Sequence, residues 1–183
     1  MEESRLEEDS PLQLAARDGD LPRMRALLRA GVDVDAGDAE GLVTPLIEAA
    51  FQGHVSAARL LLAHGAAVDA PTPTGITPLM AAVSVGNTDV MLLLLSKGAA
   101  VDATEQTTGV TALILATAYN IPESARVLLD AGADVNRSDL GGNTALHKAA
   151  HLNLRELATV LLDAGAALNP RTDYGFTPLP SCQ

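Results

Sequence analysis

Hydrophobic residues recur along this chain in short blocks that repeat at an interval of 33 or 34 residues. Within each block, apolar positions three and four residues apart follow the spacing of one face of an α-helix. The clearest marker is a pair of leucines, found at Leu27-Leu28, Leu61-Leu62, Leu94-Leu95, Leu128-Leu129 and Leu161-Leu162. Repetition at this interval predicts stacked units that share a core with their neighbours. We expect both leucines of every pair to be buried.

One block shows what each unit contains. Thr44 precedes Pro45 and an apolar run, and these residue types favour the capping position and the first turn of a helix. This first helix is expected to end at Gly53, where the chain turns. A second helix is predicted over residues 55–64, with Gly65 as its left-handed C-terminal cap. Neither helix exceeds about three turns, a length that is marginal in isolation, so neighbouring blocks must stabilise it.

The same phrases return five times. Threonines begin TPL or TAL at Thr44, Thr77, Thr111, Thr144 and Thr177, and glycines begin phrases such as GAAVDA and GADVNR at Gly31, Gly65, Gly98, Gly132 and Gly165. Over residues 10–179 this pattern resembles the ankyrin repeat. The resemblance implies units of two antiparallel helices with a projecting β-hairpin, and a concave partner-binding face made of hairpin tips and first helices. We therefore expect an all-α repeat solenoid of five repeats plus an incomplete sixth.

The repeat pattern also predicts the organisation of the chain. The segments are an acidic, disordered tail at 1–9, an N-terminal capping repeat at 10–36, repeats at 37–70, 71–103, 104–137 and 138–170, and a truncated sixth repeat at 171–183. Pro180 falls within the expected first helix of the sixth repeat, where proline removes a hydrogen bond and clashes with the preceding turn. We expect the apolar side of the fifth repeat near Leu157 and Leu161 to be poorly covered. Either the chain is a piece of a longer one, or this end is a self-association surface.

The composition of the chain excludes some classes of partner and some cellular locations. The net charge is −11, which disfavours the phosphate backbone of nucleic acid as a partner. The single cysteine excludes an internal disulfide, and the sequence contains no long apolar run or signal peptide, so we expect a cytoplasmic and/or nuclear protein without membrane contact. The acidic run at residues 1–9 is interpreted as a solvated tail, with docking of a basic partner as the alternative.

Residues that could carry chemistry do not converge in the sequence. His147 and His151 have the spacing of two metal ligands on one helix, but no third ligand and no intervening glutamate accompany them. The resemblance assigns His147 a structural hydrogen bond, as it does His54 in the Gly-His turn. His64, in the last turn of a helix, is expected at the solvated surface. No nucleophile elbow or phosphate-binding loop is present, so we expect no metal, no cofactor and no enzyme activity.

Two features of the repeat phrases remain. The recurring aspartates are interpreted as hairpin turn residues; they are Asp33, Asp35, Asp69, Asp102 and Asp134. Leu128, followed after five residues by Asp134-Val135-Asn136, resembles the stretch that asparaginyl hydroxylases modify in ankyrin repeats, and Asn136 would be the target.

The resemblance also assigns the variable positions that would face a partner. They are Glu40, Leu42, Phe51, Gln52, Ile76, Ser84, Val85, Val110, Tyr119, Leu140, Asn143, His151 and Leu152. Most of these residues are apolar. This composition is typical of the cores of protein interfaces, which contain few charged residues and many aromatic ones. The alternative is that several pack between hairpins. Leu92, whose equivalents are polar, is expected to be exposed on the outer helix, either as a stray surface leucine or as a second contact site.

The sequence therefore predicts a non-catalytic adaptor or scaffold that binds another protein on its concave face. The expected partner is an extended peptide or a domain with an apolar, mildly basic surface, and the chain is expected to be a monomer or to self-associate weakly end to end. A structural spacer or self-associating fragment of a larger scaffold is the alternative function.

Overall fold

The structure, a computed structural model, describes residues 10–37 and 43–178. It divides into two compact units, Met1–Ala99 and Ala100–Gln183. Among the described residues, the extended pairing is limited to isolated β-bridges, Thr104 with Thr111 and Ser138 with Thr144. All other regular secondary structure in that part of the chain is α-helical, as the sequence predicts.

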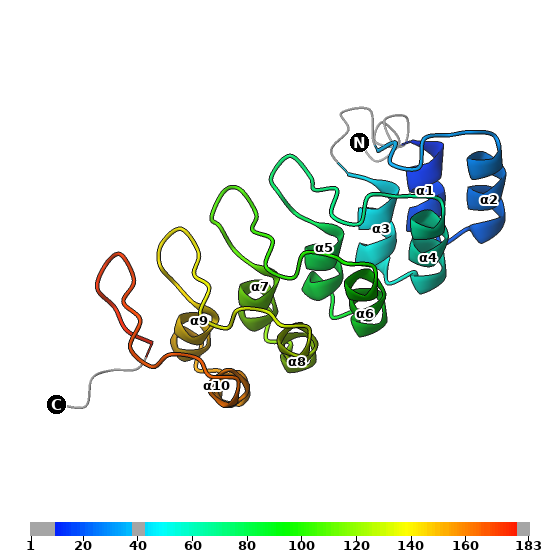
Figure 1. The fold of residues 1–183 in the computed structure, drawn as a ribbon. Coiled ribbons are helices and arrows are strands. Elements are labelled where there is room, and N and C mark those ends of the chain that lie inside the picture. Colours follow the sequence, from blue (N-terminus) through cyan, green and yellow to red (C-terminus); the bar gives the residue numbers. More distant parts are fainter. Residues whose placement is uncertain (1–9, 38–42, 179–183) are drawn as a thin grey trace. The chain divides into compact units, whose positions relative to one another are not determined.

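Unit 1 is built from pairs of short helices (Figure 1). They are α1 (Pro11–Arg17), α2 (Leu21–Arg29), α3 (Pro45–Gln52), α4 (Val55–Ala63), α5 (Pro78–Ser84) and α6 (Thr88–Ser96). Each first helix packs against the second helix that follows it, and α3 also packs between α1 and α5. The second helices form a parallel row, because α4 contacts both α2 and α6.

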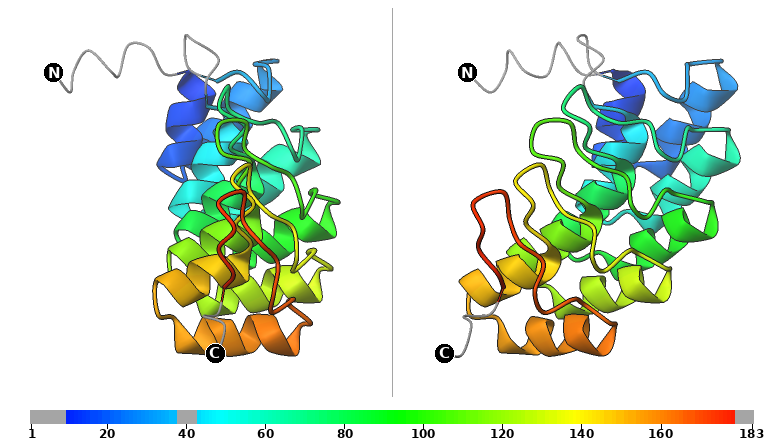
Figure 2. Two further views of the ribbon diagram at one scale, coloured as in Figure 1. Left: turned by 90° about the vertical axis from the view of Figure 1, so that its left-hand side faces the viewer. Right: turned by 60° about the vertical axis from the view of Figure 1, so that its left-hand side comes forward.

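Unit 2 repeats this arrangement. Its described helices are α7 (Ala112–Ala118), α8 (Pro122–Asp130), α9 (Ala145–His151) and α10 (Arg155–Asp163). The first helices α7 and α9 pack against each other, and so do the second helices α8 and α10. The loops of this unit project beyond α7 and α9 on one side (Figure 2).

The threonine caps form as predicted. The hydroxyl oxygens of Thr44, Thr77, Thr111 and Thr144 each accept a hydrogen bond from the backbone N–H three residues later, at 3.3 to 3.4 Å. Ser10 takes the same role at the start of α1, where it accepts from the Gln13 N–H at 3.1 Å. These bonds satisfy one of the backbone donors that a helix N-terminus leaves without a partner.

The second helices end at the recurring glycines. Gly65 has a φ of +90°, and the next N–H, of Ala66, donates to the carbonyl oxygen of Leu61 at 3.1 Å. This bond needs the left-handed conformation, which glycine adopts without steric cost. The helix ends are therefore fixed by local chemistry, and α4 stops where the sequence places its cap.

The core is narrower than the leucine pairs predict. From the second repeat onward, the first leucine of each pair is fully buried, namely Leu61, Leu94, Leu128 and Leu161. The second leucines are half-buried or exposed, so the expectation that both are buried was wrong. The second leucines therefore contribute less to the core, which alanines and buried methionines complete.

The predicted segment limits remain predictions. The division between Ala99 and Ala100 falls inside the predicted repeat 71–103, and the units therefore do not follow the repeat limits. The predicted tail at 1–9 and Pro180 lie outside the described residues.

Candidate protein-binding surface

In unit 1 the predicted partner-facing positions lie at the ends of neighbouring first helices. Phe51, in the last turn of α3, is 49% exposed, and Val85, directly after α5, is 42% exposed. Gln52 is also exposed, whereas Ile76 and Ser84 are half-buried, and the Ser84 hydroxyl donates to the Ala81 carbonyl oxygen at 2.8 Å. Because α3 and α5 pack side by side, these residues form one apolar strip with polar flanks. Glu40 and Leu42 lie outside the described residues.

In unit 2 the equivalent positions form a second apolar strip. Tyr119 and Leu152, directly after α7 and α9, are 56% and 44% exposed. Leu140, at a hairpin tip, is 68% exposed. His151 is exposed at the end of α9, whereas Val110 is half-buried. The structure therefore brings these predicted residues to the surface of one unit.

Asn143 has a structural role in addition to any contact with a partner. Its side-chain amide donates to both carboxylate oxygens of Asp139 at 3.1 Å, and its backbone N–H donates to the same carboxylate at 2.8 Å. The half-buried Asn143 therefore holds its own hairpin closed, which is a role different from packing between hairpins.

Two exposed aromatic residues extend the strip of unit 2 beyond the predicted set. Tyr174 is 83% exposed and Phe176 is 68% exposed, both in the last described hairpin. Phe176 precedes Thr177, and the residue before the repeat threonine is one of the positions assigned to the partner. The signal was therefore present in the sequence, but it was applied only to the complete repeats.

Backbone hydrogen bonds align neighbouring hairpin tips in unit 2. The Leu140 N–H donates to the Thr108 carbonyl oxygen at 2.8 Å, and the Asp173 N–H donates to the Gly141 carbonyl oxygen at 3.2 Å. Each tip is thus tied to the next. The exposed Leu140 and the last hairpin are held by main-chain bonds as well as by side-chain packing.

Glu105 anchors the first of these tips. The carboxylate is buried and accepts hydrogen bonds from the Thr107 N–H at 2.9 Å, the Thr108 N–H and the Thr108 hydroxyl. Burial raises the pKa of the Glu105 carboxyl, but these hydrogen bonds outweigh it and lower the pKa from 4.5 to about 2. Glu105 is therefore ionised at neutral pH. It fixes the loop that contains Thr108, whose carbonyl oxygen accepts the hydrogen bond from the Leu140 N–H.

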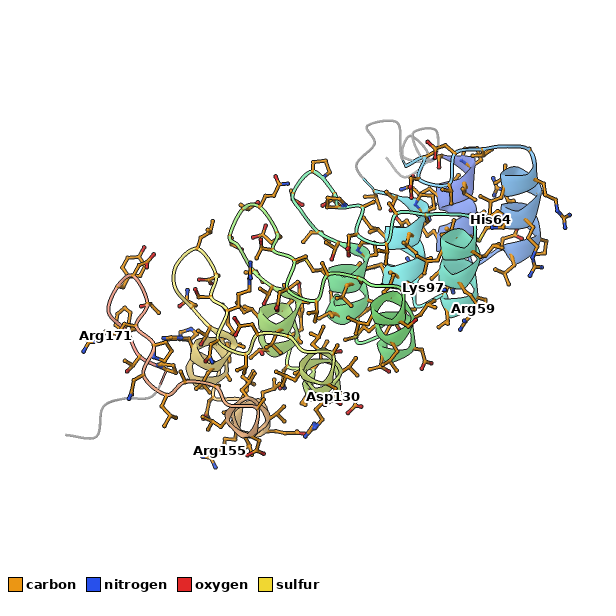
Figure 3. The ribbon with its side chains drawn as sticks, viewed as in Figure 1. Arg59, His64, Lys97, Asp130, Arg155 and Arg171 are labelled. Carbon is orange, nitrogen blue, oxygen red and sulfur yellow. The ribbon has the colours of Figure 1, made fainter. Side chains whose placement is uncertain are left out.

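Charged side chains of the second helices lie away from the hairpins. Arg59 of α4 and Asp130 of α8 project from the side of their helices opposite the loops (Figure 3). Leu92 of α6 is 53% exposed, which confirms the predicted exposed leucine on a second helix. The apolar strips therefore belong to the first helices and hairpins.

The histidines have the structural roles that the sequence predicts. His147 Nδ1 accepts from the Thr144 N–H at 3.2 Å, so Nε2 carries the hydrogen and contacts the Phe176 carbonyl oxygen at 3.2 Å. His54 Nε2 lies 3.0 Å from the Arg17 carbonyl oxygen, and His64 is exposed. The described residues contain no group of three or more potential metal ligands.

Two of the recurring aspartates connect neighbouring repeats through their carboxylates. Asp33 and Asp134 accept from a backbone N–H two residues later, as turn residues do. The carboxylates of Asp35 and Asp102 instead accept from the N–H groups of Ala67 and Asp134 in the next repeat, at 3.1 to 3.2 Å. Asp35 and Asp102 also lie in turns, as predicted, and the bonds to the next repeat are a second role that the sequence did not indicate.

Asn136 belongs to the same connecting set. Its side-chain oxygen accepts from the Ala167 N–H at 2.7 Å, and its amide nitrogen donates to the Gly165 carbonyl oxygen at 3.5 Å. Hydroxylation of Asn136 stays a prediction. A hydroxylase that requires an extended substrate must first break these two bonds, although the residue is exposed.

A hollow of about 230 Å³ lies at the end of unit 2. Its lining is mainly apolar and comes from α9, α10 and Pro178, and includes Leu146, Leu154, Ala158 and Leu162. The expectation that the apolar side of the fifth repeat near Leu157 and Leu161 is poorly covered holds only in part, because these two leucines themselves are fully buried. Leu162, the next residue of α10, is 38% exposed and lines the hollow.

Comparisons with known proteins cover nearly the whole chain. A family model described as ankyrin repeats (3 copies) matches residues 2–72 and 66–139, and a second, described as ankyrin repeats (many copies), matches residues 128–179. The ankyrin repeat and KH domain-containing protein mask-1 of Caenorhabditis elegans is 41% identical over 56 residues, which is 31% of this chain. That stretch is 2% of the relative, so the likeness concerns the repeats alone. Among the described helices, none is long and apolar enough to cross a membrane.

Proposed function

Because this chain belongs to the ankyrin repeat family, whose members generally bind other proteins, we propose that it is a non-catalytic recognition module. The partner contacts the ends of the first helices and the hairpins. Ankyrin repeat proteins are typically interaction modules without enzyme activity, and the proposed role for this chain is that of an adaptor or scaffold.

One observation carries the proposal. The chain contains two phenylalanines, two tyrosines and no tryptophan. All four aromatic residues, Phe51, Tyr119, Tyr174 and Phe176, are 49% to 83% exposed, while the core is built from leucine, alanine and methionine. Aromatic residues stabilise a core strongly when buried and are enriched at the centres of protein interfaces. Their complete absence from the core and their position at variable repeat positions support a binding role.

The proposed partner is an extended peptide or a domain with an apolar surface of mildly basic overall charge. We expect an apolar contact surface on the partner because the exposed side chains of the strips are apolar. We expect the partner to be mildly basic because this chain has a net charge of −11, and long-range attraction steers opposite charges together. The proposed location is the cytoplasm, the nucleus or both.

The double variant Phe51→Ala, Tyr119→Ala is expected to lose partners that affinity capture from native cells recovers with the wild-type chain. Each side chain is an aromatic anchor whose truncation costs about 2 kcal/mol or more at an interface hot spot. Titration calorimetry with the recovered partner should show at least a thirtyfold rise in Kd for a hot-spot anchor.

Leu92→Ala is the matched control, since Leu92 is equally exposed but lies on a second helix. Leu92→Ala should capture the same partners as the wild-type chain. Both Leu92→Ala and the double variant should melt at the wild-type temperature. Equal capture by the double variant and the wild type would refute recognition through these strips.

The end hollow favours a second candidate function, a self-associating structural spacer. Its apolar lining includes the exposed Leu162, which a second copy could cover. Size-exclusion chromatography with light scattering should then show a dimer at micromolar concentration that Leu162→Arg converts to a monomer. A monomeric wild-type chain under those conditions would remove this candidate.

A further inference from the structure

A polar hollow lies between α9 and the last hairpin of unit 2. It measures about 310 Å³, and its lining residues are Asn143, His147, Ala150, His151, Thr172, Phe176, Thr177 and Pro178. An adjoining hollow of about 240 Å³ shares Asn143, His147 and His151 and adds Lys148. Small-molecule pockets span roughly 300 to 1,000 Å³, so the two hollows lie at and below the lower end of that range, a size that one carboxylate side chain can enter.

Lys148 lines the adjoining hollow and places a positive charge beside this space, whereas the whole protein carries a net charge of −11. Lys148 and His151 are three residues apart on α9, a spacing that places two side chains on neighbouring positions of one helix face. Within the described part of the chain neither forms an ion pair with an acid. The negative end of the α9 dipole lies here, but it amounts to about half an elementary charge and is smaller than the charge of one lysine.

Asp139, on the hairpin that precedes α9, is already engaged. The Asp139 carboxylate accepts from the Gly141 N–H at 2.9 Å and from both the backbone and side-chain N–H groups of Asn143. His147 is engaged as well, through Thr144 and the Phe176 carbonyl oxygen. In the adjoining hollow the groups left to meet a ligand are therefore the Lys148 ammonium and the His151 ring, and the exposed Phe176 is an apolar wall of the larger hollow.

From this arrangement we infer that the hollow receives an aspartate or glutamate side chain of the protein partner. This inference rests on the proposed function. The Lys148 ammonium and the His151 ring donate hydrogen bonds to the carboxylate, and the methylene groups of the acid pack on Phe176. A partner of basic overall charge would thus carry one acidic residue, next to the apolar residues that contact Leu152 and Tyr119.

Selection of phage-displayed random peptides on the full chain tests the inference. The selected peptides should share one acidic residue flanked by apolar residues. Replacing that acid with its amide should weaken binding about tenfold to a hundredfold, the value of hydrogen bonds to charged groups. The double variant Lys148→Gln, His151→Gln should show the same loss and should no longer distinguish acid from amide.

Arg59→Gln is the matched control, because it removes one exposed positive charge from unit 1. It should keep the preference for the acid, and all variants should melt at the wild-type temperature. The inference would be overturned if the selected peptides share no acidic residue. It would also be overturned if replacing the acid with its amide weakens binding to the Lys148→Gln, His151→Gln variant as much as binding to the wild-type chain. Neither result would contradict the proposed function. The proposed function is tested separately, because it fails only if the Phe51→Ala, Tyr119→Ala variant captures the same native partners as the wild-type chain.

Discussion

Replacing Leu128 by alanine is expected to lower the free energy of unfolding by about 2 to 5 kcal/mol, the range for a leucine truncated in a packed core. Leu128 is fully buried in α8, so its truncation leaves a cavity that the surrounding side chains fill only in part. Small domains are stable by about 5 to 15 kcal/mol, so this loss would be a large part of the total. Urea denaturation followed by circular dichroism measures it.

Leu129→Ala provides a control at the adjacent position of the same helix. Leu129 is only half-buried, so its truncation should leave a smaller cavity and cost clearly less than that of Leu128. The same order should hold for Leu161 and Leu162, which are buried and 38% exposed. Equal losses within each pair would contradict the packing described for the second helices.

The helix ends could be predicted from the sequence because capping depends on residues only a few positions apart. Thr44 caps α3 through a bond to the third residue after it, and Gly65 ends α4 by its own conformation. The burial of the leucines could not be predicted in the same way. Whether Leu128 or Leu129 is buried depends on how α8 lies on α7, and the two residues carry the same side chain.

The connecting residues required the structure for a related reason. Asp33 and Asp35 look alike in sequence, yet only Asp35 reaches a backbone N–H of the following repeat, 32 residues away. Local sequence patterns cannot predict a hydrogen bond between residues so far apart in the sequence. The exposed Phe176, by contrast, could have been identified from its place before Thr177, and was missed because the sixth repeat was treated as incomplete.

Replacing Gly142 by alanine is expected to have the second large effect, because it should separate the last two hairpins. Gly142 has a φ of +75°, and an added Cβ would lie 3.0 Å from Thr172 Cα and 3.1 Å from the Asp173 backbone nitrogen. Left-handed backbone costs an alanine about 1 to 2 kcal/mol. Overpacking adds about 1 to 3 kcal/mol, because the crowded atoms are main chain and cannot turn aside.

Gly165→Ala separates the two costs. Gly165 also has a positive φ, +89°, but a Cβ there would meet nothing within 4 Å, so the variant should lose only the conformational part. Gly142→Ala should therefore unfold at clearly lower urea concentration than Gly165→Ala. It should also weaken the Asp173–Gly141 hydrogen bond and shift Phe176, so peptides selected on the wild-type chain should bind it less tightly. If both variants lose equal stability and keep peptide affinity, the contact between the two hairpins does not hold the last hairpin and its hollow in place.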